Sequence, residues 1–151
     1  MDRNEALQIA SNIIMLNRTE NLNCCICGSL RRGDKEVGDI DILILDKDLK
    51  DWKNSLKNKG KIYADGKSGF DILYRDVQVN FRAVPVDSWG SGLLYLTGSG
   101  SFNLKCRSIA KWKGYKLNRY GLWKGCEKVS SDEKEILRIL DLEEFIDPRM
   151  R

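Results

Sequence analysis

Two aspartates in an apolar stretch constrain this chain more than any other feature. The segment GSLRRGDKEVGDIDILIL, residues 28–45, places Asp39 and Asp41 at the start of a run of isoleucines and leucines that is typical of a β-strand. Residues i and i+2 of a strand point to the same face, so the two acids lie side by side while Ile40 and Ile42 face the core. Burying an unpaired carboxylate is costly, so a cation is expected to meet these acids.

Two parallel carboxylates without a built-in cation suit divalent metal ions. Mg²⁺ takes one or two carboxylates and completes its shell with substrate phosphates and waters. Two such ions about 4 Å apart can hold both the attacking and the leaving oxygen of a phosphoryl transfer. The alternative without chemistry is a pair of edge-strand acids that face surface arginines.

The residues before this strand fit phosphate binding. Gly28 and Ser29 follow an apolar segment and predict a small turn with a hydroxyl, where phosphate oxygens can approach backbone N–H groups. Arg31 or Arg32 supplies a planar guanidinium for those oxygens. Gly38, directly before the first acid, leaves room for a phosphate or a metal ion to come close.

Hydrophobic periodicity predicts an α/β lobe in the first half of the chain. We expect short strands joined by turns that contain Gly and Asp, and a helix over residues 46–60 whose Leu49, Trp52 and Leu56 face inward. The expected elements are a helix over residues 4–16, a buried strand at 23–27 ending in the Gly28–Ser29 turn, a strand at 39–45, a helix at 46–60, and strands at 61–65, 70–74 and 77–84.

After Pro85 the pattern changes, and we expect a second lobe. It contains a helix over 101–114, a hairpin over 115–125, and a last helix through Leu140 that begins with a capping box of Ser130 and Glu133. The boundary is predicted near Asp87–Trp89, which gives residues 1–87 and 88–151.

The second lobe carries an uneven charge. The whole chain has a net charge of +4, but residues 103–128 hold eight Lys or Arg against one acid. Trp112, Tyr115, Tyr120 and Trp123 are interleaved with these cations, and such a block can bind phosphates and stack on bases. A solvated face is the simpler alternative, but the strong bias toward one sign favours nucleic acid.

The cysteines argue against a metal centre of their own. Five are present, and Cys24 and Cys27 formally make a C-x-x-C pattern, but there is no histidine and no second pair to complete a zinc site. Small core residues are the better interpretation. The segment MDRNEALQ lacks the pattern of a secretory signal, and no run of 18 apolar residues is present. We therefore expect a cytoplasmic protein with no membrane partner, or one in the host-cell cytoplasm if the chain is viral.

Five motifs in order, GSLRRG, GDID, YLTGS, FNLKCR and LNRYGL, resemble the family X DNA polymerases, the DNA polymerase beta-like nucleotidyltransferases. The likeness runs from about Cys27 to the C-terminus. It implies an α+β fold: a nucleotidyltransferase palm (residues 1–87) with a mixed β-sheet and helices, followed by a small helical and β-hairpin thumb (88–151). Compact viral members of the family have this palm-plus-thumb form.

The resemblance also implies roles for individual residues. Asp39 and Asp41 would hold two Mg²⁺ ions, with Mn²⁺ able to substitute, and the Gly98–Ser99 peptide bond would be cis. The triphosphate would contact Gly28, Ser29, Arg32 and Gly38. The sugar and the nascent base pair would contact Tyr95, Leu96, Gly98, Asn103 and Arg107. DNA would contact Lys105, Lys111, Lys113, Lys116, Arg119 and Tyr120.

Asn80 is the main departure from the family pattern. The family has a third metal-binding aspartate there, whereas an amide offers a carbonyl oxygen but no charge and no base. Asp71 and Asp76 are the nearby acids that could substitute, and Arg82, on the same face, could pair with Asp41 in the absence of metal. The exchange is nearly isosteric, so an engineered inactive variant and a naturally weakened protein both remain open.

The sequence therefore predicts a template-directed DNA polymerase that extends a primer 3′ end with dNTPs, by two-metal phosphoryl transfer, at short gaps. Its expected partners are primer-template or gapped DNA and a dNTP, and it is expected to be a monomer. Two alternatives remain: a non-catalytic DNA- or nucleotide-binding module on a polymerase scaffold, and a nucleotidyltransferase with a non-DNA acceptor.

Overall fold

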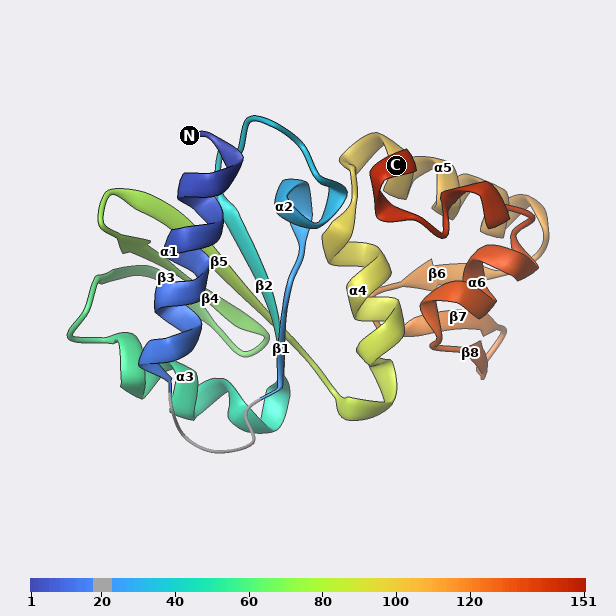
Figure 1. Ribbon diagram of the computed structural model, residues 1–151. Coiled ribbons are helices and arrows are strands. Elements are labelled where there is room, and N and C mark those ends of the chain that lie inside the picture. The colour runs from blue at the N-terminus through green and yellow to red at the C-terminus, as the bar shows by residue number, and fades with distance from the viewer. Residues whose placement is uncertain (18–22) are drawn as a thin grey trace.

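The computed structural model describes residues 1–17 and 23–151 and shows two lobes joined through helix α4 (Figure 1). The first lobe is a sheet with helices on it. Its elements are α1 (Arg3–Leu16), β1 (Cys24–Ile26), α2 (Gly28–Arg32), β2 (Ile40–Leu45), α3 (Leu49–Leu56), β3 (Lys61–Gly66), β4 (Gly69–Tyr74) and β5 (Val77–Val84), with a 3₁₀ turn at Asp46–Asp48.

The sheet of the first lobe is mixed, with strand order β1-β2-β5-β4-β3. β2 and β5 are parallel, and the other neighbouring pairs are antiparallel. Asp41 stands opposite Asn80 on β5, and Asn80 stands opposite Asp71 on β4. Because residues in register share a face of the sheet, one face carries a polar row.

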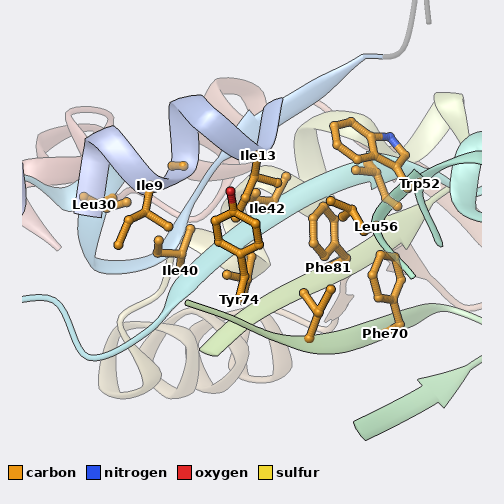
Figure 2. Packing of buried hydrophobic residues seen from close by; sticks show 14 of the residues in the cluster. Ile9, Ile13, Leu30, Ile40, Ile42, Trp52, Leu56, Phe70, Tyr74 and Phe81 are labelled. Atoms are coloured by element: carbon orange, nitrogen blue, oxygen red, sulfur yellow. The ribbon is translucent and has the colours of Figure 1, made fainter. Parts of the chain in front are cut away.

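The opposite face of the sheet is apolar and packs under α1 and α3. Ile40, Ile42 and Ile44 are fully buried there, as the two-residue alternation of β2 predicts. Figure 2 shows Phe81 between Trp52 and Phe70. The ring centroid of Phe81 lies 5.4 Å from that of Trp52 and 4.5 Å from that of Phe70. The expected inward positions of α3, Leu49, Trp52 and Leu56, are all buried. This core holds β2 and β5 rigidly beneath the polar row.

The second lobe is built on its own core. Its elements are α4 (Trp89–Thr97), α5 (Gly100–Trp112), β6 (Lys116–Asn118), β7 (Gly121–Lys124), β8 (Glu127–Ser130) and α6 (Glu133–Ile139), with 3₁₀ turns at Val86–Ser88, Glu143–Phe145 and Pro148–Met150. Phe102, Cys106 and Ala110 of α5 pack with Leu122 and with the buried leucines and isoleucine of the α6 region. The fold class predicted from the sequence is thus confirmed.

Several local expectations were wrong. β1 is short, half-buried and at the sheet edge, not a buried strand, and Gly28–Ser29 opens α2 instead of forming a turn. Helix α4 was not expected, because its small residues Gly90, Ser91 and Gly92 lower helix propensity. They are used for packing: a Cβ on Gly90 would lie 2.4 Å from the Ser131 carbonyl oxygen. The predicted hairpin gains a third strand, β8.

The last helix begins differently from the predicted capping box. Asp132, not Ser130, is the N-cap, and its carboxylate accepts a hydrogen bond from the backbone N–H of Glu135. Ser130 instead accepts from the N–H of Asp132. Glu133 is unavailable as the box partner because its carboxylate pairs with Arg31 of the other lobe.

The helices were compared with the length and hydropathy that a membrane-spanning helix needs. Among the described residues, no helix is both long enough and apolar enough to cross a bilayer.

Candidate active site

The two acids of the sequence motif meet at one amide. The Asn80 side-chain nitrogen donates to a carboxylate oxygen of Asp39 at 2.9 Å and of Asp41 at 3.0 Å. Gln78, two residues away on the same strand, donates to the Asn80 carbonyl oxygen at 3.0 Å. Gln78 therefore fixes which way the amide points, and the amide bridges both carboxylates. The side-by-side placement of the acids was predicted, but the role of Gln78 was not.

Burial shapes the electrostatics of this group. Loss of contact with water raises the pKa of the Asp41 carboxyl above its ordinary value, and the adjacent Asp39 charge acts in the same direction, whereas the hydrogen bond from Asn80 opposes them. In the part of the chain that the structure describes, no Lys or Arg forms an ion pair with either acid. The nearby charges of Arg82 and Arg32 also lower the Asp41 pKa, but burial outweighs them.

Gly28 is required by the Asp41 carboxylate. Its φ is +57°, and a Cβ at this position would lie 2.2 Å from an Asp41 side-chain oxygen. The backbone N–H of Cys27 also donates to the Asp41 carbonyl oxygen at 2.8 Å. The start of α2, which carries Ser29, is therefore held against the acids. By contrast, a Cβ on Gly38 would meet nothing within 4 Å, so no protein contact explains that glycine.

Arg32 joins the expected phosphate residues to the YLTGS segment. Its guanidinium donates to the Thr97 carbonyl oxygen at 2.6 Å and to the Asp34 carboxylate at 2.8 Å. It also lies close to Gly98, where an added Cβ would be 3.3 Å from the Arg32 Nη1 atom. The Gly98–Ser99 peptide bond is cis, as the resemblance implied.

Three of the expected sugar and base-pair residues line one small pocket. Tyr95, Asn103 and Arg107 surround a cavity of about 10 Å³ together with Asn118 and neighbouring apolar residues. The Asn103 amide donates to the Tyr95 carbonyl oxygen at 2.8 Å, which ties α5 to the end of α4. Leu96 packs instead on the cluster of Cys27, Leu43 and Val84, on the face of the sheet that α4 covers.

Comparison with known proteins decides the family. The DNA polymerase beta palm family matches residues 1–80, and the DNA polymerase beta thumb family matches residues 92–151. The chain belongs to the family X DNA polymerases.

Three relatives show how much of this family X chain, and of each relative, the matches cover. It is similar to the repair DNA polymerase X of African swine fever virus, with 30% identity over 78% of this chain and 75% of the viral protein. It is also 30% identical to rat DNA polymerase lambda over 81% of this chain, but the match spans only 26% of that larger protein. A Bacillus subtilis DNA polymerase/3′-5′ exonuclease matches 63% of this chain.

Some of the thumb residues that were expected to bind DNA are exposed, whereas others already contact side chains of this chain. Lys111 and Lys116 are exposed. Lys113 pairs with Asp141, Lys105 lies over the Phe145 ring, and Arg119 lies over the Tyr95 ring at 5.1 Å. Tyr120 is 39% exposed.

Asp71, which stands opposite Asn80 on β4, is already paired. Arg82 donates to the Asp71 carboxylate at 2.6 Å, so the expected pairing of Arg82 with Asp41 is wrong. Arg82 reaches across to β4 because Asp71 offers it a carboxylate on the same face. Asp76 lies in the β4–β5 turn with φ +63°, away from the row.

Sequence reasoning missed a buried ionic cluster between the lobes. Arg31 makes two hydrogen bonds of 2.7 Å to the Glu133 carboxylate and one of 2.7 Å to the Thr97 hydroxyl. Arg151, whose side chain is 0% exposed, donates to the same Glu133 carboxylate at 3.1 Å. Only the paired arginines hinted at this cluster, and nothing local showed which of them would face the thumb.

The donor set fits one divalent cation better than two. Asp39 and Asp41 offer two carboxylates beside the start of α2, and Mg²⁺ takes one or two carboxylates and completes its shell with substrate phosphates and waters. Residues 1–17 and 23–151 contain no group of three or more Asp, Glu, Cys or His side chains that could hold a metal. A cation on the Asn80 side would therefore lack the third carboxylate.

Proposed function

We propose that this chain is a template-directed DNA polymerase that adds dNTPs to a primer 3′-hydroxyl at short gaps, with chemistry weakened by Asn80. The observation that carries the proposal is the convergence of Asp39 and Asp41 on one amide, beside Gly28 and Ser29, in a family X chain. The boundary between the lobes that we propose, between residues 87 and 88, falls in the segment between the palm match, which ends at residue 80, and the thumb match, which begins at residue 92.

Asp39 and Asp41 would hold Mg²⁺, or Mn²⁺ in its place, together with the oxygens of the incoming triphosphate. Such an ion, when bound, neutralises negative charge that develops on the transferred phosphoryl group. Ser29 and Arg32 would contact the triphosphate, and Gly38, where an added Cβ would meet nothing within 4 Å, would leave its approach open. Arg32 keeps two protein contacts on one side, which pre-orients its remaining donors.

Asn80 limits what the chain can do on the primer side. Its amide nitrogen faces the two acids, so its carbonyl oxygen is directed at Gln78 and not at them. An amide cannot take the proton of the primer hydroxyl at neutral pH. The residues thus favour nucleotide binding over rapid bond formation. Tyr95, Asn103 and Arg107, which line one pocket, would face the sugar and the nascent base pair. The exposed Lys111, Lys116 and Tyr120 would contact DNA.

The experiment that tests the proposal is primer extension on gapped DNA with Mg²⁺, comparing this chain with Asn80→Asp. We expect extension to rise by ~10²-fold or more, the effect of restoring one preorganised electrostatic partner. The double variant Asp41→Asn with Asn80→Asp serves as a control and should stay inactive. Equal extension by the unchanged chain and by the Asn80→Asp variant would contradict the role given to this position.

The Asn80 bridge supports a second candidate, a non-catalytic DNA- or nucleotide-binding module. The amide satisfies both acids without a metal, which a binding protein could retain. Extension that stays absent in Asn80→Asp, together with salt-sensitive binding to DNA, would favour it. Transfer of a labelled nucleotide to a protein or small molecule but not to a gapped duplex would favour a non-DNA acceptor.

A further inference from the structure

Three cysteines in β1 and the residue after it remain outside the proposed function. Cys25 and Cys27 point to the same face of the sheet, the face covered by α4, while Cys24 packs on the opposite core. All five cysteines are free thiols, and Cys27 is fully buried. Cys25 and Cys27 thus bring two thiols together on one face of the sheet, against the helix that joins the lobes.

The Cys25 thiol borders an open pocket. A cavity of about 550 Å³ is lined by Asn23, Cys24, Cys25, Leu45, Val86 and Trp89. Most of these side chains are apolar, and Val86 is 71% exposed at its edge. A small uncharged molecule can therefore reach the half-buried Cys25 from solvent without unfolding of the lobe.

The groups around Cys25 favour its thiolate. The neighbouring Cys27 thiol, which donates to the Cys25 carbonyl oxygen at 3.6 Å, lowers the pKa of the Cys25 thiol to about 7 against the effect of burial. The nearby Arg31 charge adds to the decrease, while Glu133 opposes it. Cys24, on the same strand, has a raised pKa because of burial. Cys27 itself has a pKa well above its ordinary value, because of the interaction with Cys25 and of burial, so its thiol stays protonated when Cys25 ionises.

We propose that Cys25 is a covalent modification site for small, uncharged disulfides that enter the pocket beside Trp89. The Cys25 thiolate attacks one sulfur of the disulfide, the disulfide bond breaks, and a new Cys25–sulfur bond forms. The released thiolate takes a proton from water, so no other oxidant is needed. The adduct would lie against Trp89, at the start of α4. This inference does not depend on the polymerase proposal.

The test is the reaction of the folded protein with 4,4′-dithiodipyridine, with each cysteine followed by peptide mass spectrometry from about pH 5.5 to 9.5. We expect Cys25 to react with a midpoint near its pKa of about 7 and before Cys24, whose midpoint should lie higher. At about pH 6 the advantage of Cys25 over an ordinary thiol should be roughly fivefold, because its larger thiolate fraction outweighs its lower nucleophilicity. The exposed Cys126 is the internal comparison.

Two variants separate this site from simple accessibility. Cys27→Ala removes the thiol donor and should move the Cys25 midpoint upward by one pH unit or more, toward ordinary thiol behaviour, whereas Cys24→Ala should leave it in place. Modification of Cys126 alone, with Cys25 reacting only after urea is added, would overturn the proposal. So would a Cys25 midpoint that is unchanged in Cys27→Ala.

Discussion

Asp41 and Glu133 are both carboxylates drawn away from water, yet their surroundings are opposite. Asp41 is met by a neutral amide, and its pKa lies above the ordinary value because burial is not fully compensated. Burial acts to raise the pKa of Glu133 too, but the hydrogen bonds from Arg31 and the charge of Arg151 outweigh it, and the pKa falls. The acid that links the two lobes is thus paired with two arginines, whereas the acid of the candidate site has a neutral amide as its partner.

The largest expected effect is that of Glu133→Gln. This change leaves the buried Arg31 and Arg151 guanidiniums without their counterion, so we expect a loss of about 3 kcal/mol in the free energy of unfolding, measured with urea at pH 7. Because the Glu133 pKa is lowered on folding, its contribution is present above its ordinary pKa of 4.5 and is lost as the pH falls through the folded value. The difference from the unmodified chain should shrink in acid.

Glu135→Gln is the matched control for this prediction. Glu135 lies on the same helix but is exposed, so its replacement should change stability by less than about 0.5 kcal/mol. Equal losses for the two changes would mean that the ion pairs of Glu133 contribute no more to the free energy of unfolding than an exposed glutamate of the same helix does.

A smaller loss is expected for Asn80→Asp without metal. The change replaces the donor that bridges Asp39 and Asp41 by a third carboxylate, so we expect a decrease of about 2 kcal/mol at pH 7 in EDTA. Added Mg²⁺ should recover this loss, because an ion that binds only the folded state stabilises it. The exposed Asn54→Asp makes the same chemical change and should show neither effect. Destabilisation that Mg²⁺ does not relieve would argue against a cation site.

The Asp71–Arg82 ion pair is more exposed than the ion pairs of Glu133, so it tests how the contribution of an ion pair depends on burial. It is partly exposed, with side-chain exposures of 17% and 30%, so Asp71→Asn should cost about 1 kcal/mol or less in urea unfolding. Asp76→Asn, in a turn whose positive φ an asparagine accepts, should be neutral. A cost for Asp71→Asn as large as that of Glu133→Gln would erase the distinction between the pairs.

The smallest effect, and one of opposite sign, is expected for Asp41→Asn. Since the pKa of Asp41 is raised on folding, its contribution is present below its ordinary pKa of 3.8 and is lost as the pH rises through the folded value. Removing the charge should therefore stabilise the protein slightly at pH 7, with the gain disappearing in acid, while any Mg²⁺-dependent stabilisation is lost. Thermal unfolding at several pH values, with and without Mg²⁺, measures both.

Local pattern was enough for much of the palm. The two-residue period of β2 sets Ile40, Ile42 and Ile44 against the acids, and the spacing of Leu49, Trp52 and Leu56 sets the inner face of α3. Both follow from backbone geometry within one element, so neighbours elsewhere in the chain could not change them. Helix α4 was missed because Gly90, Ser91 and Gly92 lower its helix propensity, and strand β8 was missed because it is short and mostly polar.

By itself, the sequence determined that Asp39 and Asp41 stand side by side directly after Gly38, and that the family X motifs occur in order along the chain. Only the tertiary structure decided which cation or amide each acid would meet. Arg31 binds Glu133 across a separation of 102 residues, Arg82 binds Asp71 instead of Asp41, and Gln78 aims the Asn80 amide. A side chain of arginine can reach several acids with similar energy, so its partner is set by how the lobes and strands pack, which no local pattern encodes.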